Sequence, residues 1–268
     1  MNKILSIITL LIAFGAAVFA QGESQSFSVP LSAPGEPAVL EASVMQGTMR
    51  VTAYEGTEVL VDVTFMQDEE DEPEEHEGLT RIPSVSGGLT VEENGNRVHI
   101  DTDWSQSEMH LDIRVPVRTS LRLEGVNSDF IEAHGVTGQH ELSHSNGDII
   151  ATGLRGSVIA DTTNGDVTVE LLEVTADTPM SFTTFNGDID LTLPSTIQAE
   201  LRMQTGQGDF YTDFEVQTRP SEARVEREES EKGFRVRIER EVQGAIGGGG
   251  PELRFKTING DIYLRKLK

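Results

Sequence analysis

The tetrapeptide Asn-Gly-Asp-Ile or Asn-Gly-Asp-Val stands at residues 146–149, 164–167, 186–189 and 259–262, and a related Gln-Gly-Asp-Phe stands at 207–210. The first two steps between copies are 18 and 22 residues long. A motif that recurs at such a period is typical of stacked supersecondary units, each of which shares its core with its neighbours. We therefore expect a repeat protein, and the residues around each copy indicate what the unit is.

Apolar and polar residues alternate on both sides of each turn. The residue four positions before the Asn or Gln is apolar in every copy, and so is the residue three positions after it. The first set is Leu142, Ala160, Phe182, Met203 and Phe255, and the second is Ile149, Val167, Ile189, Phe210 and Ile262. This alternation is typical of strands with one buried face, so each unit reads as strand, turn, strand. An earlier segment around Asn127 keeps the same columns but has Ser128 in place of the turn glycine.

Two all-β architectures fit this unit. An Asn-Gly pair between alternating strands predicts a hairpin, because such a turn needs a positive φ that Gly adopts freely. The residue two before the Asn or Gln favours a solenoid instead, because like residues recur where identical positions stack. In the five copies it is His144, Thr162, Thr184, Thr205 and Thr257. We predict a single-stranded β-helix, or β-solenoid, of coils about 18 to 22 residues long, with a meander of hairpins as the alternative.

The N-terminus reads as a secretory signal. Lys3 precedes an apolar run from Ile4 to Val18, and the small residue Ala20 follows. This pattern predicts a signal peptide over residues 1–20, cleaved before Gln21; an uncleaved anchor is the alternative, although the run is short for a membrane span. We expect a single solenoid domain over residues 21–268 that is exported to the periplasm, the cell surface or the medium, with no stable membrane span after cleavage.

Composition limits the partners. The net charge of −24 argues against nucleic acid and anionic lipid. There is no cysteine, so disulfides and thiolate metal sites are excluded.

The remaining segments also read as β-structure joined by loops. Short strands are predicted ahead of the repeats, at 39–44, 48–54 and 58–65. Residues 68–77 are so acidic that we expect a solvated loop; they lack the spaced ligands and the glycine of a calcium loop. Residues 215–250 read as an irregular insert that contains a hairpin, with strands at 224–227 and 234–238.

The order of these features resembles a known family. Leu111-Asp-Ile-Arg-Val-Pro116 is followed by serial Asn-Gly-Asp coils, a glycine-rich run at 247–250 and a final Thr257-Ile-Asn-Gly-Asp-Ile262. Over roughly residues 38–268 this order resembles the bacterial DUF4097 family of candidate adhesins. The resemblance implies a β-helix-like, envelope-associated or exported protein, and it implies no catalytic residues. The acidic stretch at 68–77 departs from the family pattern.

Two groups of side chains could suggest chemistry. His140 and His144 lie four apart on one face of a strand, a spacing that could hold a metal ion. Their columns elsewhere hold core residues or Thr, so we expect a structural role. Asp161, Asp188 and Asp190 could suggest a carbohydrate-active β-helix enzyme, but such sites need a cationic or metal partner in a cleft, and no basic cluster accompanies them in the sequence.

The turn acids form a third candidate group: Asp148, Asp166, Asp188, Asp209 and Asp261. Stacked like charges repel by about 1 kcal/mol per pair in water and about 4 kcal/mol near a protein surface, so each carboxylate needs compensation. Either backbone N–H groups of the turns or bound Ca²⁺ can provide it. We favour the backbone, because the motif differs from the calcium-binding Gly-Gly-x-Gly-x-Asp repeat.

From the sequence we therefore predict no catalytic, cofactor-binding or metal-binding residues and no cofactor. The expected role is that of a non-enzymatic, adhesin-like envelope scaffold or binding surface for an unknown envelope protein or glycan. A carbohydrate-active enzyme and a calcium-dependent adhesive module are the alternatives.

Overall fold

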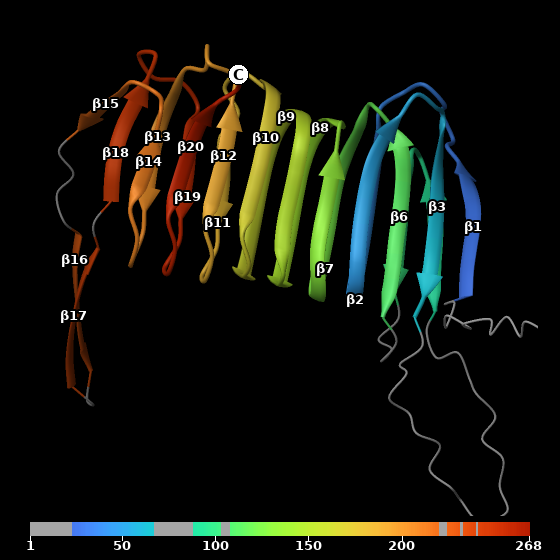
Figure 1. Ribbon diagram of the computed structural model, residues 1–268, viewed down its shortest axis with the longest axis horizontal. Coiled ribbons are helices and arrows are strands. Elements are labelled where there is room, and N and C mark those ends of the chain that lie inside the picture. The colour runs from blue at the N-terminus through green and yellow to red at the C-terminus, as the bar shows by residue number, and fades with distance from the viewer. Residues whose placement is uncertain (1–22, 67–87, 103–107, 220–223, 231–232, 240) are drawn as a thin grey trace, which may run out of the picture.

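Every regular element in the described part of the chain is a β-strand (Figure 1). The computed structural model describes residues 23–66, 88–102, 108–219, 224–230, 233–239 and 241–268. The predicted signal peptide, its cleavage site and the acidic stretch at 68–77 lie outside the described residues. The all-β prediction is confirmed, and none of the described residues forms a helix of the length and hydropathy that a membrane span requires.

The strands form two walls that meet at the Asn-Gly turns. We call the wall whose strands lead into the turns the entry wall, and the wall whose strands leave them the exit wall. The first halves of β2 (Ala38–Tyr54) and β7 (Thr119–His134) belong to the entry wall and their second halves to the exit wall. Conversely, β9 (Asp148–Asn164) starts in the exit wall and returns to the entry wall.

The entry wall runs, in spatial order, through β4 (Leu89–Asn94), β5 (Arg97–Thr102), β2, β7, β8 (Thr137–Asn146), β9, β11 (Met180–Thr183), β19 (Glu252–Lys256), β13 (Ala199–Gln204), β18 (Glu241–Ile246) and β15 (Val216–Arg219). The exit wall runs through β1 (Glu23–Pro30), β3 (Glu58–Phe65), β6 (Met109–Pro116), β2, β7, β9, β10 (Val167–Val174), β12 (Ile189–Leu193), β20 (Ile262–Lys266) and β14 (Phe210–Thr212).

The strands around the Asn-Gly turns pair in parallel. Asn146 aligns with Asn164 at the end of the β8–β9 ladder, and Val167 of β10 pairs with Ile149 of β9. The two arms of one turn therefore belong to different walls, and each arm pairs with the same arm of the next unit. The hairpin alternative is wrong for these turns.

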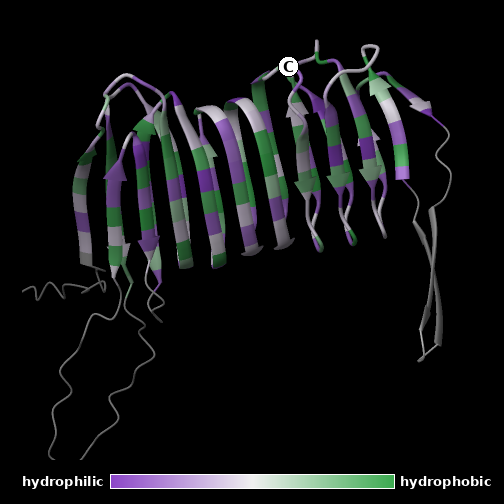
Figure 2. Ribbon diagram, turned by 180° about the vertical axis from the view of Figure 1, so that it is seen from behind, coloured by the Kyte–Doolittle hydropathy of each residue, from purple (hydrophilic) through white to green (hydrophobic). Residues whose placement is uncertain are grey.

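The core lies between the walls, and hydropathy alternates along the strands (Figure 2). The predicted inward columns are buried except for Phe210, which is half-buried because β14 is the last strand of the exit wall. Phe182 and Phe255 stack in the centre with ring centroids 5.5 Å apart. The predicted inward faces of these strands are therefore confirmed.

The spatial order of the coils differs from their order in the chain. The last coil, β19 and β20, lies between the coil of Asn186 and the coil of Gln207. The final coil carries a complete Asn-Gly-Asp and a Phe that matches Phe182, whereas the copy at Gln207 is degenerate and takes the outer position. The sequence does not indicate this spatial order, because the coil of Asn259 stands last in the chain.

The structure also brings into the stack segments that the sequence did not assign to it. Gln46 pairs with Asn127 and Gly47 with Ser128, so β2 is one bent strand that forms an earlier coil rather than two short strands. Residues 215–250 are not simply irregular, because β15 and β18 extend the entry wall in antiparallel pairing. Within that region β16 (Arg224–Ser230) pairs antiparallel with β17 (Gly233–Glu239), as predicted.

Candidate functional site

The Asn side chains of the turns form a continuous ladder along one corner of the stack. The Nδ2 group of each Asn donates to the Oδ1 of the Asn one coil earlier in space. The bonds are Asn146 to Asn127 at 2.8 Å, Asn164 to Asn146 at 2.8 Å, Asn186 to Asn164 at 2.7 Å and Asn259 to Asn186 at 2.6 Å. A carboxamide suits this position because it both donates and accepts.

The turn acids form a second ladder beside the first. Four of the five turn acids donate their backbone N–H to the Oδ1 of the Asp one coil earlier: Asp166 to Asp148, Asp188 to Asp166, Asp261 to Asp188 and Asp209 to Asp261, each at 2.8 Å. Backbone N–H groups thus compensate four of the five carboxylates, those of Asp148, Asp166, Asp188 and Asp261, although the donor belongs to the next coil and not to the same turn. Charge-assisted bonds of this kind offset the repulsion within the column.

The Thr column and the turn glycines complete the corner. Each Thr hydroxyl donates to the turn Gly carbonyl one coil earlier: Thr162 to Gly147 at 3.1 Å, Thr184 to Gly165 at 2.9 Å, Thr257 to Gly187 at 3.0 Å and Thr205 to Gly260 at 3.0 Å. The glycine is needed because the coils approach closely; a Cβ on Gly165 would collide with the carbonyl oxygen of Gly147. The hydrogen bonds at this corner therefore join each coil to the next.

His140 and His144 are both buried, with 1% and 3% exposure, and have different partners. His140 Nε2 donates to the carbonyl of Arg155 at 3.4 Å, and His144 Nε2 is hydrogen-bonded to the hydroxyl of Ser128 at 2.5 Å. His144 occupies the Thr position of its coil, and Ser128 occupies the turn-glycine position of the coil before it. The two departures from the repeat thus bind each other, which supports a structural role for His144.

Burial keeps both imidazoles neutral. Desolvation lowers the pKa of His140 to about 4, against a weaker raising effect of its bond to Arg155. Desolvation also lowers the pKa of His144, although the charge of Asp148 partly opposes it. In each ring Nδ1 has no hydrogen-bond partner among the described residues, so a proton there would be buried without an acceptor.

The protein should lose stability as the pH falls from about 6.5 to about 4. In this range the unfolded chain protonates His140 and the folded chain does not, so protons favour unfolding. Each pKa unit corresponds to about 1.36 kcal/mol, so His140 accounts for a loss of about 3 kcal/mol. Urea unfolding of wild type and His140→Leu across this range measures it. The idea is contradicted if the variant shows the same pH dependence as wild type.

The three acids that could suggest an enzyme each have a partner within the stack. Asp161 accepts from the Ser143 hydroxyl at 3.1 Å, and Asp188 belongs to the turn ladder. Asp190 accepts from Arg265 Nε at 2.8 and 2.9 Å. This cationic partner comes from the last coil, so the sequence did not reveal it. Elsewhere too, within the described part of the chain, no three His, Cys, Asp or Glu side chains gather as ligands of one metal ion.

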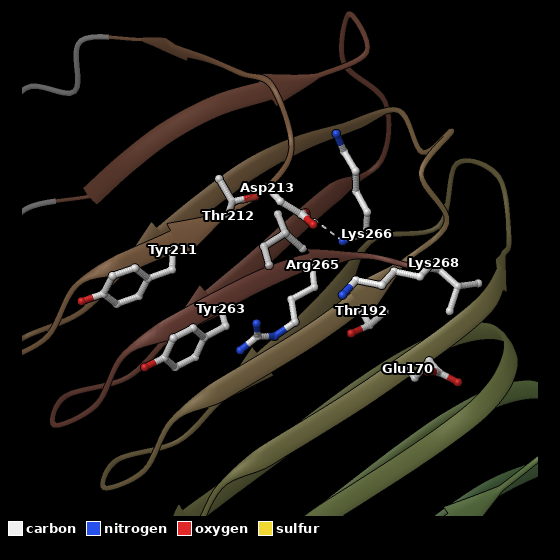
Figure 3. Close-up of a pocket in the computed structure, with 11 residues that line it drawn as sticks. Glu170, Thr192, Tyr211, Thr212, Asp213, Tyr263, Arg265, Lys266 and Lys268 are labelled. Atoms are coloured by element: carbon white, nitrogen blue, oxygen red, sulfur yellow. Dashed lines mark hydrogen bonds between the residues drawn. The ribbon is translucent and has the colours of Figure 1, made fainter.

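An open groove of about 570 Å³ crosses the outer face of the exit wall where the last coils stack (Figure 3). It spans β10, β12, β20 and β14. Its lining comprises Glu170, Thr192, Tyr211, Thr212, Asp213, Tyr263, Leu264, Arg265, Lys266, Leu267 and Lys268. Both tyrosines stand four positions after the turn Asn or Gln, in an outward column that otherwise holds Ile150, Thr168 and Asp190. Comparing this outward column between copies could have found the pair.

The two tyrosine rings are stacked in the groove. Tyr211 and Tyr263 have centroids 5.1 Å apart and an interplanar angle of 13°. The Arg265 guanidinium lies 5.0 Å from the Tyr263 centroid and reaches toward Asp190 on β12, away from Tyr211 on β14. Tyr263 also donates its hydroxyl to Asp261 at 3.0 Å, and this bond raises its pKa. The charges of Asp209 and Asp261 raise the pKa of Tyr211, so both phenols remain protonated donors.

Three solved structures are similar to this chain at low sequence identity. A candidate cell adhesion protein from Clostridium sporogenes is 8% identical, covers 92% of this chain and 100% of its own, and superposes with a TM-score of 0.48. Candidate adhesins from Bacteroides fragilis and Parabacteroides merdae are 10% and 9% identical, cover 92% of this chain and 99% and 97% of their own, and give TM-scores of 0.30 and 0.22.

No curated protein matches the sequence. The sequence profile of Toastrack DUF4097 matches residues 82–246, a narrower range than the motifs alone indicated. Because this match covers more than half of the chain, the protein belongs to the Toastrack DUF4097 family.

Proposed function

We propose that this protein is an exported, non-enzymatic component of the cell envelope, an adhesin-like scaffold that presents a binding surface. In this proposal the Asn-Gly-Asp coil of about 18 to 22 residues is the repeating unit of a β-solenoid. The observation that carries the proposal is that the polar groups of each turn form hydrogen bonds with the turns of the neighbouring coils. Amides, carboxylates and carbonyls of successive turns bind one another, which makes the stack one stiff body with two long outer faces.

The partners of the acidic residues support a non-catalytic role. A general acid or nucleophile must be able to reach a substrate and change its protonation state or bonding. Asp190 is instead held by Arg265, and Asp188 and Asp161 are bonded within the stack. These bonds favour a scaffold over the carbohydrate-active enzyme.

The Asp ladder also weighs against the calcium-dependent module. A Ca²⁺ site takes six to eight oxygen ligands. Four of the turn carboxylates already use Oδ1 to accept a backbone N–H from a neighbouring coil: Asp148, Asp166, Asp188 and Asp261. We therefore propose that the scaffold does not depend on Ca²⁺.

Export can be tested directly in the producing cell. We expect the protein in the envelope fraction or the medium, with Gln21 as its first residue, because the charged start, apolar run and Ala20 form a cleavable signal. N-terminal sequencing of the fractionated protein measures this. Protein retained in the cytoplasm, or exported protein that still begins with Met1, would contradict the proposal.

A further inference from the structure

The tyrosine pair in the groove offers an exposed aromatic platform. Tyr211 is 49% exposed although it lies on a stacked strand pair. Among the described strands, β14 pairs only with β20, so Tyr263 is the aromatic neighbour of Tyr211, and both rings lie in the lining of the groove (Figure 3). A half-exposed ring held at a strand end is a surface on which a flat ligand can stack.

The platform is held in place before any ligand arrives. Tyr263 lies between Tyr211 and the Arg265 guanidinium, and Arg265 is itself fixed by two contacts to Asp190. Tyr263 is also tethered by its hydroxyl to Asp261. A ring fixed on this support loses little conformational entropy on binding, which favours affinity.

Donors and acceptors of hydrogen bonds frame the platform. Asp213 is exposed and uses Oδ1 for the Lys266 N–H at 2.9 Å, so its other carboxylate oxygen can accept from a ligand. Thr192 and Glu170 lie farther along the same face (Figure 3). The cation of Lys266 lies 5.3 Å from the Phe214 ring. The groove can therefore both donate to and accept from a ligand with many hydroxyl groups.

The charges of the groove point to an uncharged ligand. The lining contains two carboxylates, Glu170 and Asp213, and three cations, Arg265, Lys266 and Lys268. Arg265 is already paired with Asp190. The whole chain carries a net charge of −24, which repels an anionic polymer. Neither a strongly acidic nor a strongly basic ligand matches this setting.

We propose that the groove binds a neutral oligosaccharide, with one pyranose ring stacked on Tyr211 and its hydroxyls bonded to Asp213 and the neighbouring polar groups. An aromatic ring is negative on its face, so it attracts the partly positive C–H groups that one face of a pyranose presents. The hydroxyls at the sugar's rim match the mixed donors and acceptors around the platform. The volume of the groove falls in the range of about 300 to 1,000 Å³ that small-ligand sites occupy. This inference rests on the proposed function as a binding surface and names its ligand class.

The test is calorimetric titration of the purified protein with soluble oligomers of glucose, mannose and N-acetylglucosamine, and with a galacturonic acid oligomer as the acidic counterpart. We expect at least one neutral oligomer to bind saturably and more tightly than the acidic one. Tyr211→Ala should weaken that binding at least about tenfold, which corresponds to about 1.4 kcal/mol. Tyr211→Phe keeps the ring and should stay within about threefold of wild type.

Matched variants separate binding from folding. Phe185 is 51% exposed and lies outside the groove, so Phe185→Ala removes an equally exposed ring and should leave sugar binding unchanged. Asp213→Asn keeps an oxygen that accepts the Lys266 N–H, so the melting temperature should not fall. It removes the charge from the group that accepts from the sugar hydroxyl, so the affinity for the sugar should fall. If Tyr211→Ala melts early, Asp213→Asn carries the test.

Three results would overturn the inference: no binding of any neutral oligomer, binding that Tyr211→Ala and Asp213→Asn leave unchanged, or preference for the acidic oligomer. The proposed function fails on a different measurement, the cell fraction and the N-terminus. An exported protein that binds no neutral sugar would retain the scaffold proposal and lose only this ligand class.

Discussion

Phe182→Ala should lower the free energy of unfolding by about 3 to 5 kcal/mol, the cost of deleting a large aromatic side chain from a packed core. Phe182 is fully buried, and its ring stacks on Phe255 at 5.5 Å. It lies on β11, which has a parallel partner on each side, β9 and β19, so the cavity cannot close by moving an edge strand. Urea unfolding monitored by circular dichroism measures the change.

Thr183→Ala is the matched control for this substitution. Thr183 is the next residue of β11 and points to the outer face, so its truncation should change stability by no more than about 0.5 kcal/mol. The reverse order of effects would mean that the strand faces are exchanged, because a shift of one residue turns every side chain of a strand to the other side.

Gly165→Val should also be strongly destabilising, for two reasons that add. Gly165 has φ +154, outside the range that a β-branched residue prefers, which costs about 1 to 3 kcal/mol. A Cβ there would also collide with the backbone carbonyl of Gly147, and overpacking of a tight contact costs about 1 to 3 kcal/mol more. Thermal and urea unfolding of the variant measure the sum.

Gly35→Val separates these two causes. Gly35 has φ +88, but a Cβ on it would meet nothing within 4 Å. Its replacement should therefore show the backbone strain without the collision between coils. Equal destabilisation by Gly35→Val and Gly165→Val would show that the close approach of Gly165 to Gly147 does not limit the choice of residue.

The repeating unit could be predicted from the sequence because it depends on neighbours along the chain. Alternation of period two identified the inward columns, and the register around Phe182 is correct. The Thr column indicated parallel stacking, since like residues at one position form bonds such as that of Thr184 to Gly165. Gln46-Gly47-Thr48 was missed because it lacks both the Asn and the Asp of the motif, whereas Gln207-Gly208-Asp209 lacks only the Asn.

The order of the coils depended on contacts between distant segments. The coil of Asn259 lies next to the coil of Asn186, 73 residues earlier, because its complete motif continues both side-chain ladders and its Phe255 stacks on Phe182. Nothing near residue 259 in the chain records this neighbour. The degenerate copy at Gln207 takes the outer position, where no further coil must be bonded.

The candidate binding groove was decided by tertiary structure for the same reason. Tyr211 and Tyr263 are 52 residues apart in the chain and meet because β14 pairs with β20. Arg265 is 75 residues from Asp190, and this pair meets only because β20 enters between β12 and β14. The sequence by itself determined the coil, its buried face and its corner, since these follow from local periodicity and turn chemistry. Which outward side chains share a surface was decided by the stacking order, since that order depends on how well whole coils match one another.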